Sequence, residues 1–234
     1  NPPPRLITGA EQDAVLRELL RGDIDDGATV WPERLRPALG MTGFAVELRD
    51  LMLRASERGL GPEDLVALGE RRDRPEWVAA GRFAQRYEQV MLLRGAVGLE
   101  APEATAPALD AAELVGAALA AFATDPDLLA SERNRVRHLL VDDAQHLDPQ
   151  AAHLVRVIGT GTRTSTVAGD PDQSVFGFRG ADPTFLEQLA DDDPSRRIVL
   201  GTNYRAAPAV AAVSHRIARR VPGLPPHRGA ASPD

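Results

Sequence analysis

Residues 167–181 constrain the fold and function of this chain more than any other segment. They read Val-Ala-Gly-Asp-Pro-Asp-Gln-Ser-Val-Phe-Gly-Phe-Arg-Gly-Ala, so an apolar run ends in Gly-Asp, and a glutamine, two aromatic residues and an arginine between glycines follow. Polar groups at the end of a parallel strand can face a phosphate, and aromatic faces beyond them can stack on bases. The pattern therefore predicts a strand followed by a loop that contacts two ligands.

Two other segments also place polar residues after an apolar run. Residues 136–141 are followed by Asp142, Asp143, Ala144 and Gln145. Further along, residues 200–205 read Leu-Gly-Thr-Asn-Tyr-Arg. A single Gly-Asp pair would be a weak signal, whereas three such segments within about seventy residues are a strong one when their order and spacing match a known family.

The spacing of apolar residues separates a helical part from a mixed part. Residues 1–125 have helical periodicity and are predicted to be all-helical. Beyond them, short β-rich runs alternate with helical stretches, which predicts an α/β fold with a parallel sheet covered by helices. The predicted strands are 136–142, 164–168 and 196–200, the helices between them are 148–158 and 182–190, a last helix covers 206–220, and residues 222–234 are predicted to be disordered.

In the order of these segments the chain resembles the UvrD/Rep/PcrA family of superfamily 1 DNA helicases. Residues 167–181 resemble the family's third helicase motif, and residues 203–205 resemble its Asn-Tyr-Arg motif. The resemblance covers residues 128–218 by motif and the preceding segment by position. It implies a RecA-like parallel-sheet motor-domain portion preceded by an all-helical inserted subdomain. The implied parts are the helical subdomain (1–125), the C-terminal part of the first motor domain (126–202), the start of the second (203–220) and a disordered end (221–234).

The resemblance implies ATP and Mg²⁺ as cofactors and assigns the acidic pair to them. Asp142 would hold Mg²⁺ through its carboxylate, although an aspartate after a strand can also cap a helix or a turn. Asp143 stands where the family has a glutamate that acts as general base. Aspartate is one methylene shorter, so either hydrolysis is weakened or a backbone shift compensates. Gln145 matches a glutamine of the ATP site, and a solvent-facing side chain is the alternative.

Three further residues are implied to contact the nucleotide. Gln173 would sense the γ-phosphate, with a turn-stabilising role as the alternative. Tyr204 would stack on adenine, and Arg205 would contact the γ-phosphate as an arginine finger. Asp143, Gln173 and Arg205 are thus the predicted catalytic residues. For Asn203 we expect a structural hydrogen bond.

The aromatic residues of the same loop are assigned to DNA. Phe176 and Phe178 match family aromatics beside single-stranded DNA, where the family usually has tyrosine and tryptophan. Phenylalanine keeps the stacking face but loses the polar group, and a core position is the alternative for either residue. Arg179 is expected to pair with an acidic strand-end residue and so to couple the nucleotide side to the DNA side.

The absence of lysine excludes one essential motif. Every basic residue of the chain is arginine. A P-loop needs a lysine that reaches the β- and γ-phosphates, so this chain cannot contain one. The sequence therefore predicts an internal fragment of a larger motor that is inactive as an ATPase by itself, and the remainder of the motor is its predicted partner.

Composition limits the kinds of site that the chain can contain. The formal net charge is −7, so a nucleic-acid site must be a local patch or a stacking surface. The chain has no cysteine, which excludes disulfides and thiolate metal sites, and no apolar run approaches the length of a membrane span. We expect a cytoplasmic protein without a membrane partner.

Two functions from different classes are compatible with these residues. The first is part of an ATP-dependent 3′–5′ single-stranded-DNA translocase or helicase in DNA repair or recombination. Residues 6–12 and the Asp-Asp-Ala-Gln segment resemble the AdnA-type subunit of the actinobacterial AdnAB helicase–nuclease, which implies double-strand break repair and a helicase–nuclease partner subunit. The second is a non-catalytic DNA-binding or scaffold subunit with a degraded ATPase site, which Asp143 supports.

Overall fold

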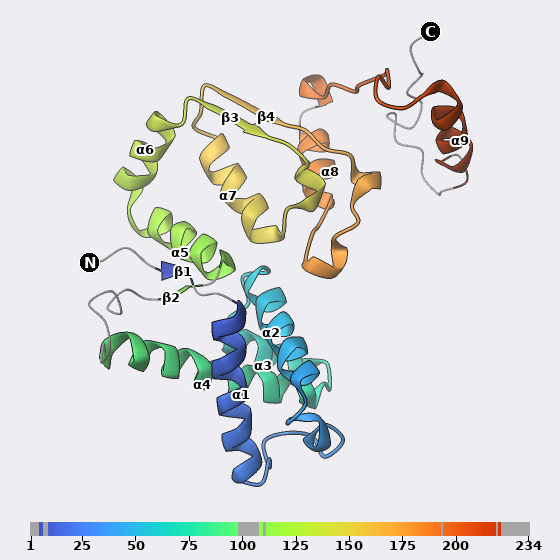
Figure 1. Ribbon diagram of the computed structural model, residues 1–234. Coiled ribbons are helices and arrows are strands. Elements are labelled where there is room, and N and C mark those ends of the chain that lie inside the picture. Colours follow the sequence, from blue (N-terminus) through green and yellow to red (C-terminus); the bar gives the residue numbers. More distant parts are fainter. Residues whose placement is uncertain are drawn as a thin grey trace.

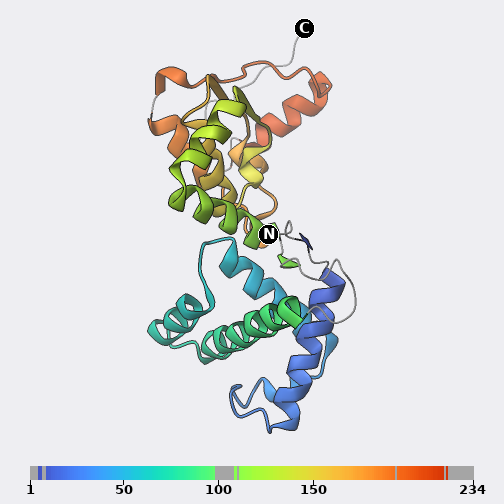
Figure 2. The ribbon, with the colours of Figure 1, turned by 90° about the vertical axis from the view of Figure 1, so that its left-hand side faces the viewer.

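The computed structural model describes residues 5–6, 9–97, 108–109, 111–192, 194–218 and 220. Two bodies stand one above the other in Figures 1 and 2: a helical body of residues 9–97 and an α/β body of residues 111–192. The predicted disordered end, residues 221–234, lies outside the described residues. The change from helices to a mixed pattern follows the order predicted from the sequence.

Four α-helices form the helical body. They are α1 (Gly9–Asp25), α2 (Thr42–Ser56), α3 (Pro62–Arg71) and α4 (Pro75–Val97), with the short 3-10 helix η1 (Arg36–Ala38) between α1 and α2. Pro62 and Pro75 begin their helices because proline lacks an N–H that the first turn leaves unpaired and already has a helical φ. The Asp64 carboxylate also accepts a hydrogen bond from the Gly61 N–H at 3.0 Å, which fixes the start of α3.

The core of the helical body is built on large side chains from the helices and from the segment between α1 and η1. Trp31 is 2% exposed and packs edge-on to Phe44 at 5.3 Å and against Phe83 at 5.9 Å. The Trp31 indole N–H donates to Asp23 at 2.7 Å, and Arg86 donates two hydrogen bonds to the same buried carboxylate. A buried charge is tolerated when it is paired and hydrogen-bonded, so this network replaces the water that Asp23 has lost.

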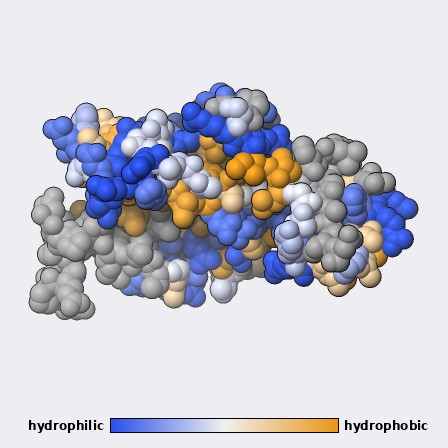
Figure 3. All heavy atoms as spheres, turned by 90° about the horizontal axis from the view of Figure 1, so that it is seen from above, coloured by the Kyte–Doolittle hydropathy of each residue, from blue (hydrophilic) through white to orange (hydrophobic). Residues whose placement is uncertain are grey.

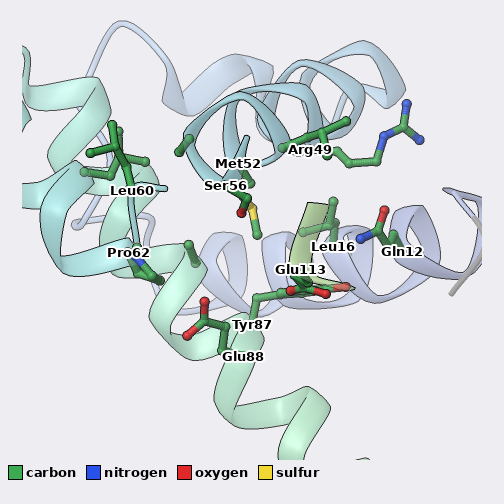
Figure 4. A pocket seen from close by; sticks show the side chains of 15 residues that line it. Gln12, Leu16, Arg49, Met52, Ser56, Leu60, Pro62, Tyr87, Glu88 and Glu113 are labelled. Carbon is green, nitrogen blue, oxygen red and sulfur yellow. The ribbon is translucent and has the colours of Figure 1, made fainter. Parts of the chain in front are cut away.

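Helices α3 and α4 approach each other closely because glycine stands at their contact. A Cβ at Gly81 would lie 2.7 Å from the Pro62 carbonyl oxygen and from Val66 Cγ2. A small cavity of about 30 Å³ lies between helices of this body and Glu113, with Leu16, Met52 and Glu88 among its other lining residues (Figure 4). That volume suits a single water molecule and not an organic ligand.

One part of the first 125 residues departs from the all-helical prediction. Strand β1 (Arg5–Leu6) pairs in parallel with β2 (Ala108–Leu109), so the chain segments on either side of the helical body meet. Two-residue strands are too short to produce a visible alternation of apolar and polar residues. The prediction was therefore wrong here, because only the pairing of distant segments defines them.

The α/β body begins with two helices and continues as a parallel sheet. Its elements are α5 (Ala111–Thr124), α6 (Pro126–Arg135), β3 (His138–Val141), η2 (Ala144–His146), α7 (Pro149–Gly159), β4 (Thr164–Val167), η3 (Pro171–Gln173), η4 (Gly177–Arg179) and α8 (Thr184–Asp192). Helix α7 connects β3 to β4, which pair in parallel from His138↔Thr164 to Val141↔Val167. Phe185 of α8 packs with Ala144 and Ala152 in a small core.

The predicted third strand at 196–200 is wrong. Arg196 ends the 3-10 helix η5 (Pro194–Arg196), residues 197–200 form no strand, and within the described residues the larger sheet consists of β3 and β4. Ile198 and Leu200 are 86% and 79% exposed, and Leu140 of β3 is 76% exposed. A β-rich run becomes a strand only when a neighbour pairs with it. Figure 3 shows the molecule from above the view of Figure 1, and hydrophobic residues are visible on that face.

The two bodies meet where α2 ends and α7 begins. The Gln150 backbone N–H donates to the Glu57 carbonyl oxygen at 3.1 Å, and the Gln150 side-chain amide donates to the Ser56 carbonyl oxygen at 2.5 Å. These carbonyls belong to the last turn of α2 and have no partner within the helix. The α/β body therefore supplies the caps for a helix of the helical body.

Beyond the α/β body, α9 (Pro208–Ala218) is the last helix among the described residues. Among the described residues no single helix has both the length and the apolarity of a membrane span. Helices α5 and α6 meet those criteria only when they are joined across a bend of 112°.

Candidate functional site

The parallel register of β3 and β4 brings two polar segments to one edge of the sheet. Beyond the strands, the Ala168 N–H donates to the Val141 carbonyl at 2.8 Å and the Ala144 N–H donates to the Ala168 carbonyl at 3.0 Å. These bonds continue the pairing past the last strand residues. The acidic pair that follows β3 therefore lies beside the Gly-Asp pair that follows β4.

Asp142 is an exposed carboxylate at this edge. Its Oδ1 accepts the backbone N–H of Asp143 at 2.9 Å, so the turn alternative describes part of its role. Among the described residues no three His, Asp or Glu side chains converge on one point. Mg²⁺ is commonly held by one or two carboxylates together with water and substrate phosphates, so Asp142 fits as a single ligand to that ion.

Asp143 has a left-handed backbone conformation, with φ 52° and ψ 37°. Among residues with a side chain, aspartate and asparagine enter this region most easily. The turn therefore provides a physical reason for the shorter acid at this position. The two alternatives for Asp143, weakened hydrolysis and a compensating backbone shift, stay predictions.

Gln145 is buried and joins the two strand ends. It is 1% exposed, so the solvent-facing alternative is wrong. Its Nε2 donates to Asp143 Oδ1 at 3.1 Å, and its Oε1 accepts the backbone N–H of Asp170 at 3.1 Å. Gly169 must be glycine for this arrangement, because a Cβ there would lie 2.6 Å from Gln145 Oε1.

The chain of hydrogen bonds continues into the loop after β4. Asp170 Oδ1 accepts the Asp172 N–H at 3.0 Å, and Asp170 Oδ2 accepts the Gln173 side-chain amide at 2.7 Å. Gln173 is exposed, so its amide can exchange this bond for a ligand. The structure thus links Asp143, Gln145, Asp170 and Gln173 in one continuous network.

The aromatic residues lie at the far end of the same loop. Phe176 is half-buried and its ring lies 4.6 Å from that of His146, while Phe178 is 73% exposed. The core alternative is therefore wrong for Phe178. The Phe176 and Phe178 rings are 6.2 Å apart in an edge-to-face arrangement, which leaves the Phe178 ring accessible to a stacking partner.

Arg179 adopts a different contact from the one expected. Its guanidinium lies 5.3 Å from the centre of the Phe176 ring and 5.4 Å from that of Phe178. Among the described residues it forms no ion pair, so the expected pairing with an acidic strand-end residue is absent. Exposed arginine favours an aromatic face here because the carboxylates at the strand ends already accept backbone and amide N–H groups.

Comparison with known proteins decides the family. The family model described as the UvrD/REP helicase N-terminal domain matches residues 5–194, which include both bodies and the network at the strand ends. The chain belongs to this family. The family assignment agrees with the motif-based interpretation of residues 142–145 and 167–181.

Curated relatives of the UvrD/REP chain carry helicase names. It is 37% identical over 76 residues to ATP-dependent DNA helicase Rep of Escherichia coli, 32% over 127 residues to ATP-dependent DNA helicase UvrD1 of Mycobacterium leprae, and 27% over 150 residues to DNA helicase II of Haemophilus influenzae. The matches cover 32%, 50% and 64% of this chain but only 11%, 16% and 18% of the relatives. The chain therefore spans less than a fifth of the length of each.

Tyr204 and Arg205 of the UvrD/REP chain lie outside the hydrogen-bonded network. Tyr204 is 82% exposed, and among the described residues neither side chain forms a hydrogen bond or an ion pair. The Asn203 carboxamide oxygen accepts the backbone N–H groups of Arg205 and Ala206, both at 3.0 Å, so the structural hydrogen bond predicted for Asn203 is confirmed. The proposed contacts of Tyr204 and Arg205 with a nucleotide stay predictions.

Two residues of the site had no distinct signal in the sequence. Asp170 is the centre of the loop network, and His146 packs on Phe176. The sequence marks Asp170 only as the end of an apolar run, and no spacing in the sequence assigns a role to His146. Their roles depend on contacts between the two strand ends, which local spacing does not reveal.

Proposed function

We propose that this chain is an internal part of an ATP-dependent 3′–5′ single-stranded-DNA translocase or helicase that acts in DNA repair or recombination. The observation that carries the proposal is the Gln145 bridge between the acidic pair and the loop bearing Phe178. A motor must connect nucleotide state to its grip on DNA. A buried amide that contacts both segments is a suitable physical connection.

On the nucleotide side, the proposal assigns each polar residue one task. Asp142 is a ligand of the Mg²⁺ that accompanies ATP, and the ion supplies charge neutralisation at the phosphates. Asp143 orients and deprotonates the attacking water. Gln173 exchanges its bond to Asp170 for the γ-phosphate. Tyr204 stacks on the adenine and Arg205 stabilises charge on the γ-phosphate.

On the DNA side, the exposed ring of Phe178 stacks on a base of the single strand. Phe176 packs edge-to-face with this ring, and the Arg179 guanidinium lies over it. Stacking is tolerant of sequence because every base has a π-face. The proposal therefore includes a preference for single strands and no sequence specificity.

Exposed apolar residues of the α/β body support the further proposal that the remainder of a motor covers this body. Leu140 is largely exposed on β3, and the apolar residues 198–200 lie free of a strand. Additional strands and a phosphate-binding loop from outside this chain would bury them. An AdnA-type subunit in a helicase–nuclease, with double-strand break repair as its task, is the narrower form of this proposal.

DNA-stimulated ATP hydrolysis by the full-length protein that contains this chain tests the proposal. We expect single-stranded DNA to stimulate turnover, Asp142→Asn to abolish it, and Phe178→Ala to weaken the stimulation while leaving basal hydrolysis intact. Translocation along a 3′- or 5′-tailed substrate then gives the polarity. A full-length protein that binds ATP and DNA with no effect of either ligand on the other would contradict the proposal.

Asp143 supports the second function, a scaffold or DNA-binding subunit with a degraded ATPase site. The shorter acid in a left-handed turn can leave water without an effective base. Binding of a fluorescent ATP analogue by the full-length protein, measured beside its turnover, separates the two functions. DNA binding without nucleotide binding favours the scaffold.

A further inference from the structure

A glycine of the aromatic loop rests on an ion pair of the helical body. Gly180 follows Phe178 and Arg179, is buried, and has φ 86°. Beside it, Arg54 Nη1 and Glu57 Oε2 lie 2.7 Å apart at the end of α2, with side chains that are 23% and 11% exposed. Residues of two different bodies therefore share this contact.

The contact leaves no room for a side chain at Gly180. A Cβ at this position would overlap the Glu57 carboxylate and lie 2.8 Å from Arg54 Nη1. Glycine is favoured here for two separate reasons, the left-handed backbone and the proximity of the ion pair. The ion pair thus forms the surface on which the turn is seated.

Hydrogen bonds transmit the position of Gly180 to the aromatic rings. The Gly180 N–H donates to the Gly177 carbonyl at 3.1 Å, and the Ala181 N–H donates to the Phe176 carbonyl at 3.2 Å. These two bonds close the turn that carries Phe178. A displacement of Gly180 therefore displaces the exposed ring.

Glu57 is itself fixed on the opposite side. Its carbonyl oxygen accepts the Gln150 N–H at 3.1 Å, at the start of α7. The aromatic loop consequently has two anchors. At one end the Ser174 hydroxyl donates to the Gln145 carbonyl at 3.2 Å, and at the other end Gly180 rests on Glu57.

We propose that Glu57 is a positioning residue for the DNA-binding loop: held by Arg54, its carboxylate seats the Gly180 turn and sets the orientation of Phe178. This inference rests on the proposed function, because Phe178 must contact DNA for its orientation to matter. It assigns the helical body a part in the grip on single-stranded DNA. The nucleotide network anchors the loop at Gln145, and the helical body anchors it at Glu57.

Single-stranded-DNA affinity of full-length variants, corrected for folded fraction, tests the inference. We expect Glu57→Ala to weaken binding by about tenfold, and Gly180→Ala to weaken it by at least as much. Glu57→Gln keeps the size of the seat and should stay within about threefold of the wild type. Affinity for an ATP analogue should be unchanged in all three.

A double variant distinguishes a specific contact between Glu57 and the Gly180 turn from a non-specific loss of DNA affinity. Glu57→Ala removes the carboxylate that lies nearest to a Cβ at Gly180, while Arg54 Nη1 remains, so Gly180→Ala should cost less DNA affinity in the Glu57→Ala background than in the wild type. Gly177→Ala is the matched control, because a Cβ at Gly177 meets no atom within 4 Å. We expect its affinity to equal that of the wild type.

Three outcomes would overturn the inference. Glu57→Ala could leave DNA affinity unchanged while Phe178→Ala weakens it. The proposed function would then be retained, and the positioning role of Glu57 would be rejected. The effects of Gly180→Ala and Glu57→Ala could be additive, which would show that the two residues act independently. If Phe178→Ala also leaves DNA affinity unchanged, the proposed DNA site fails and the inference fails with it.

Discussion

The side-chain oxygen of Gln145 accepts the backbone N–H of Asp170 at 3.1 Å, across the edge where β3 and β4 end. The same side chain donates to Asp143, so one buried amide contacts both polar segments of the site. A carboxamide is suited to this position because it offers a donor and an acceptor at its two ends. Replacing it removes a link between the acidic pair and the loop that we propose to bind DNA.

We expect Gln145→Ala to destabilise the fold by about 1–3 kcal/mol, because it leaves the Asp170 N–H without its acceptor in a partly buried site. Chemical denaturation of the chain measures this. Gln173→Ala is the control, since its amide is exposed and its loss should change stability by less than about 0.5 kcal/mol. Equal effects of the two substitutions would show that the Gln145 bridge contributes nothing specific.

Asp143→Glu should preserve or raise the ATPase rate of the full-length protein, since the longer side chain extends further toward the attacking water. The left-handed backbone makes glutamate less favourable than aspartate, so a small loss of stability should accompany the change. Steady-state hydrolysis and thermal unfolding measure the two effects. A rate decrease beyond about tenfold, or 1.4 kcal/mol of barrier, would mean that the site requires the shorter acid.

Phe178→Ala should weaken single-stranded-DNA binding by the value of one stacked base, about 1–3 kcal/mol. Because the side chain is 73% exposed, its loss should change stability little. Val175→Ala is a matched control on the same loop, 65% exposed but without a π-face. DNA titration together with thermal unfolding distinguishes binding from folding. A large decrease in melting temperature with unchanged affinity would remove Phe178 from the DNA site.

Two glutamates of α4 should respond to pH with opposite sign. The Glu88 side chain is exposed, but partial desolvation raises the pKa of Glu88, so its contribution to stability falls as pH rises through the folded pKa. A backbone hydrogen bond and the nearby guanidinium groups of Arg74 and Arg34 lower the pKa of Glu76. The contribution of ionised Glu76 to stability is therefore lost as pH falls through the folded pKa.

Glu88→Gln should therefore raise stability at neutral pH, whereas Glu76→Gln should lower it. Urea unfolding at several pH values between about 3 and 7 measures both variants against the wild type. The difference from wild type should diminish toward low pH in each case. A destabilising Glu88→Gln at neutral pH would show that its carboxylate has a favourable partner when ionised.

The isolated chain should show only background ATP hydrolysis, with or without single-stranded DNA. It has no lysine to reach the β- and γ-phosphates and no glycine-rich P-loop. Phosphate release by purified chain measures this. DNA-stimulated turnover by the chain alone would refute the prediction that its phosphate cradle lies elsewhere.

Local patterns were sufficient to predict most elements of the α/β body. Strands β3 and β4 lie within the predicted ranges 136–142 and 164–168, and α7 lies within one residue of the helix predicted at 148–158. These features depend on residues close together in the chain, so the sequence contains all the information they need. The acidic pair and the Gly-Asp pair also lie at the same sheet edge because parallel strands end together.

Only the tertiary structure decided which side chains are buried and which segments pair. Residues 196–200 have strand composition but no neighbouring strand, and Gln145 became a buried bridge because Asp170 is folded against it. The seat of Gly180 on Glu57 joins residues far apart in sequence. The amino-acid sequence by itself determined the local conformations and the kinds of chemical group at the site. Long-range packing, which no short window of sequence contains, determined which of those groups meet.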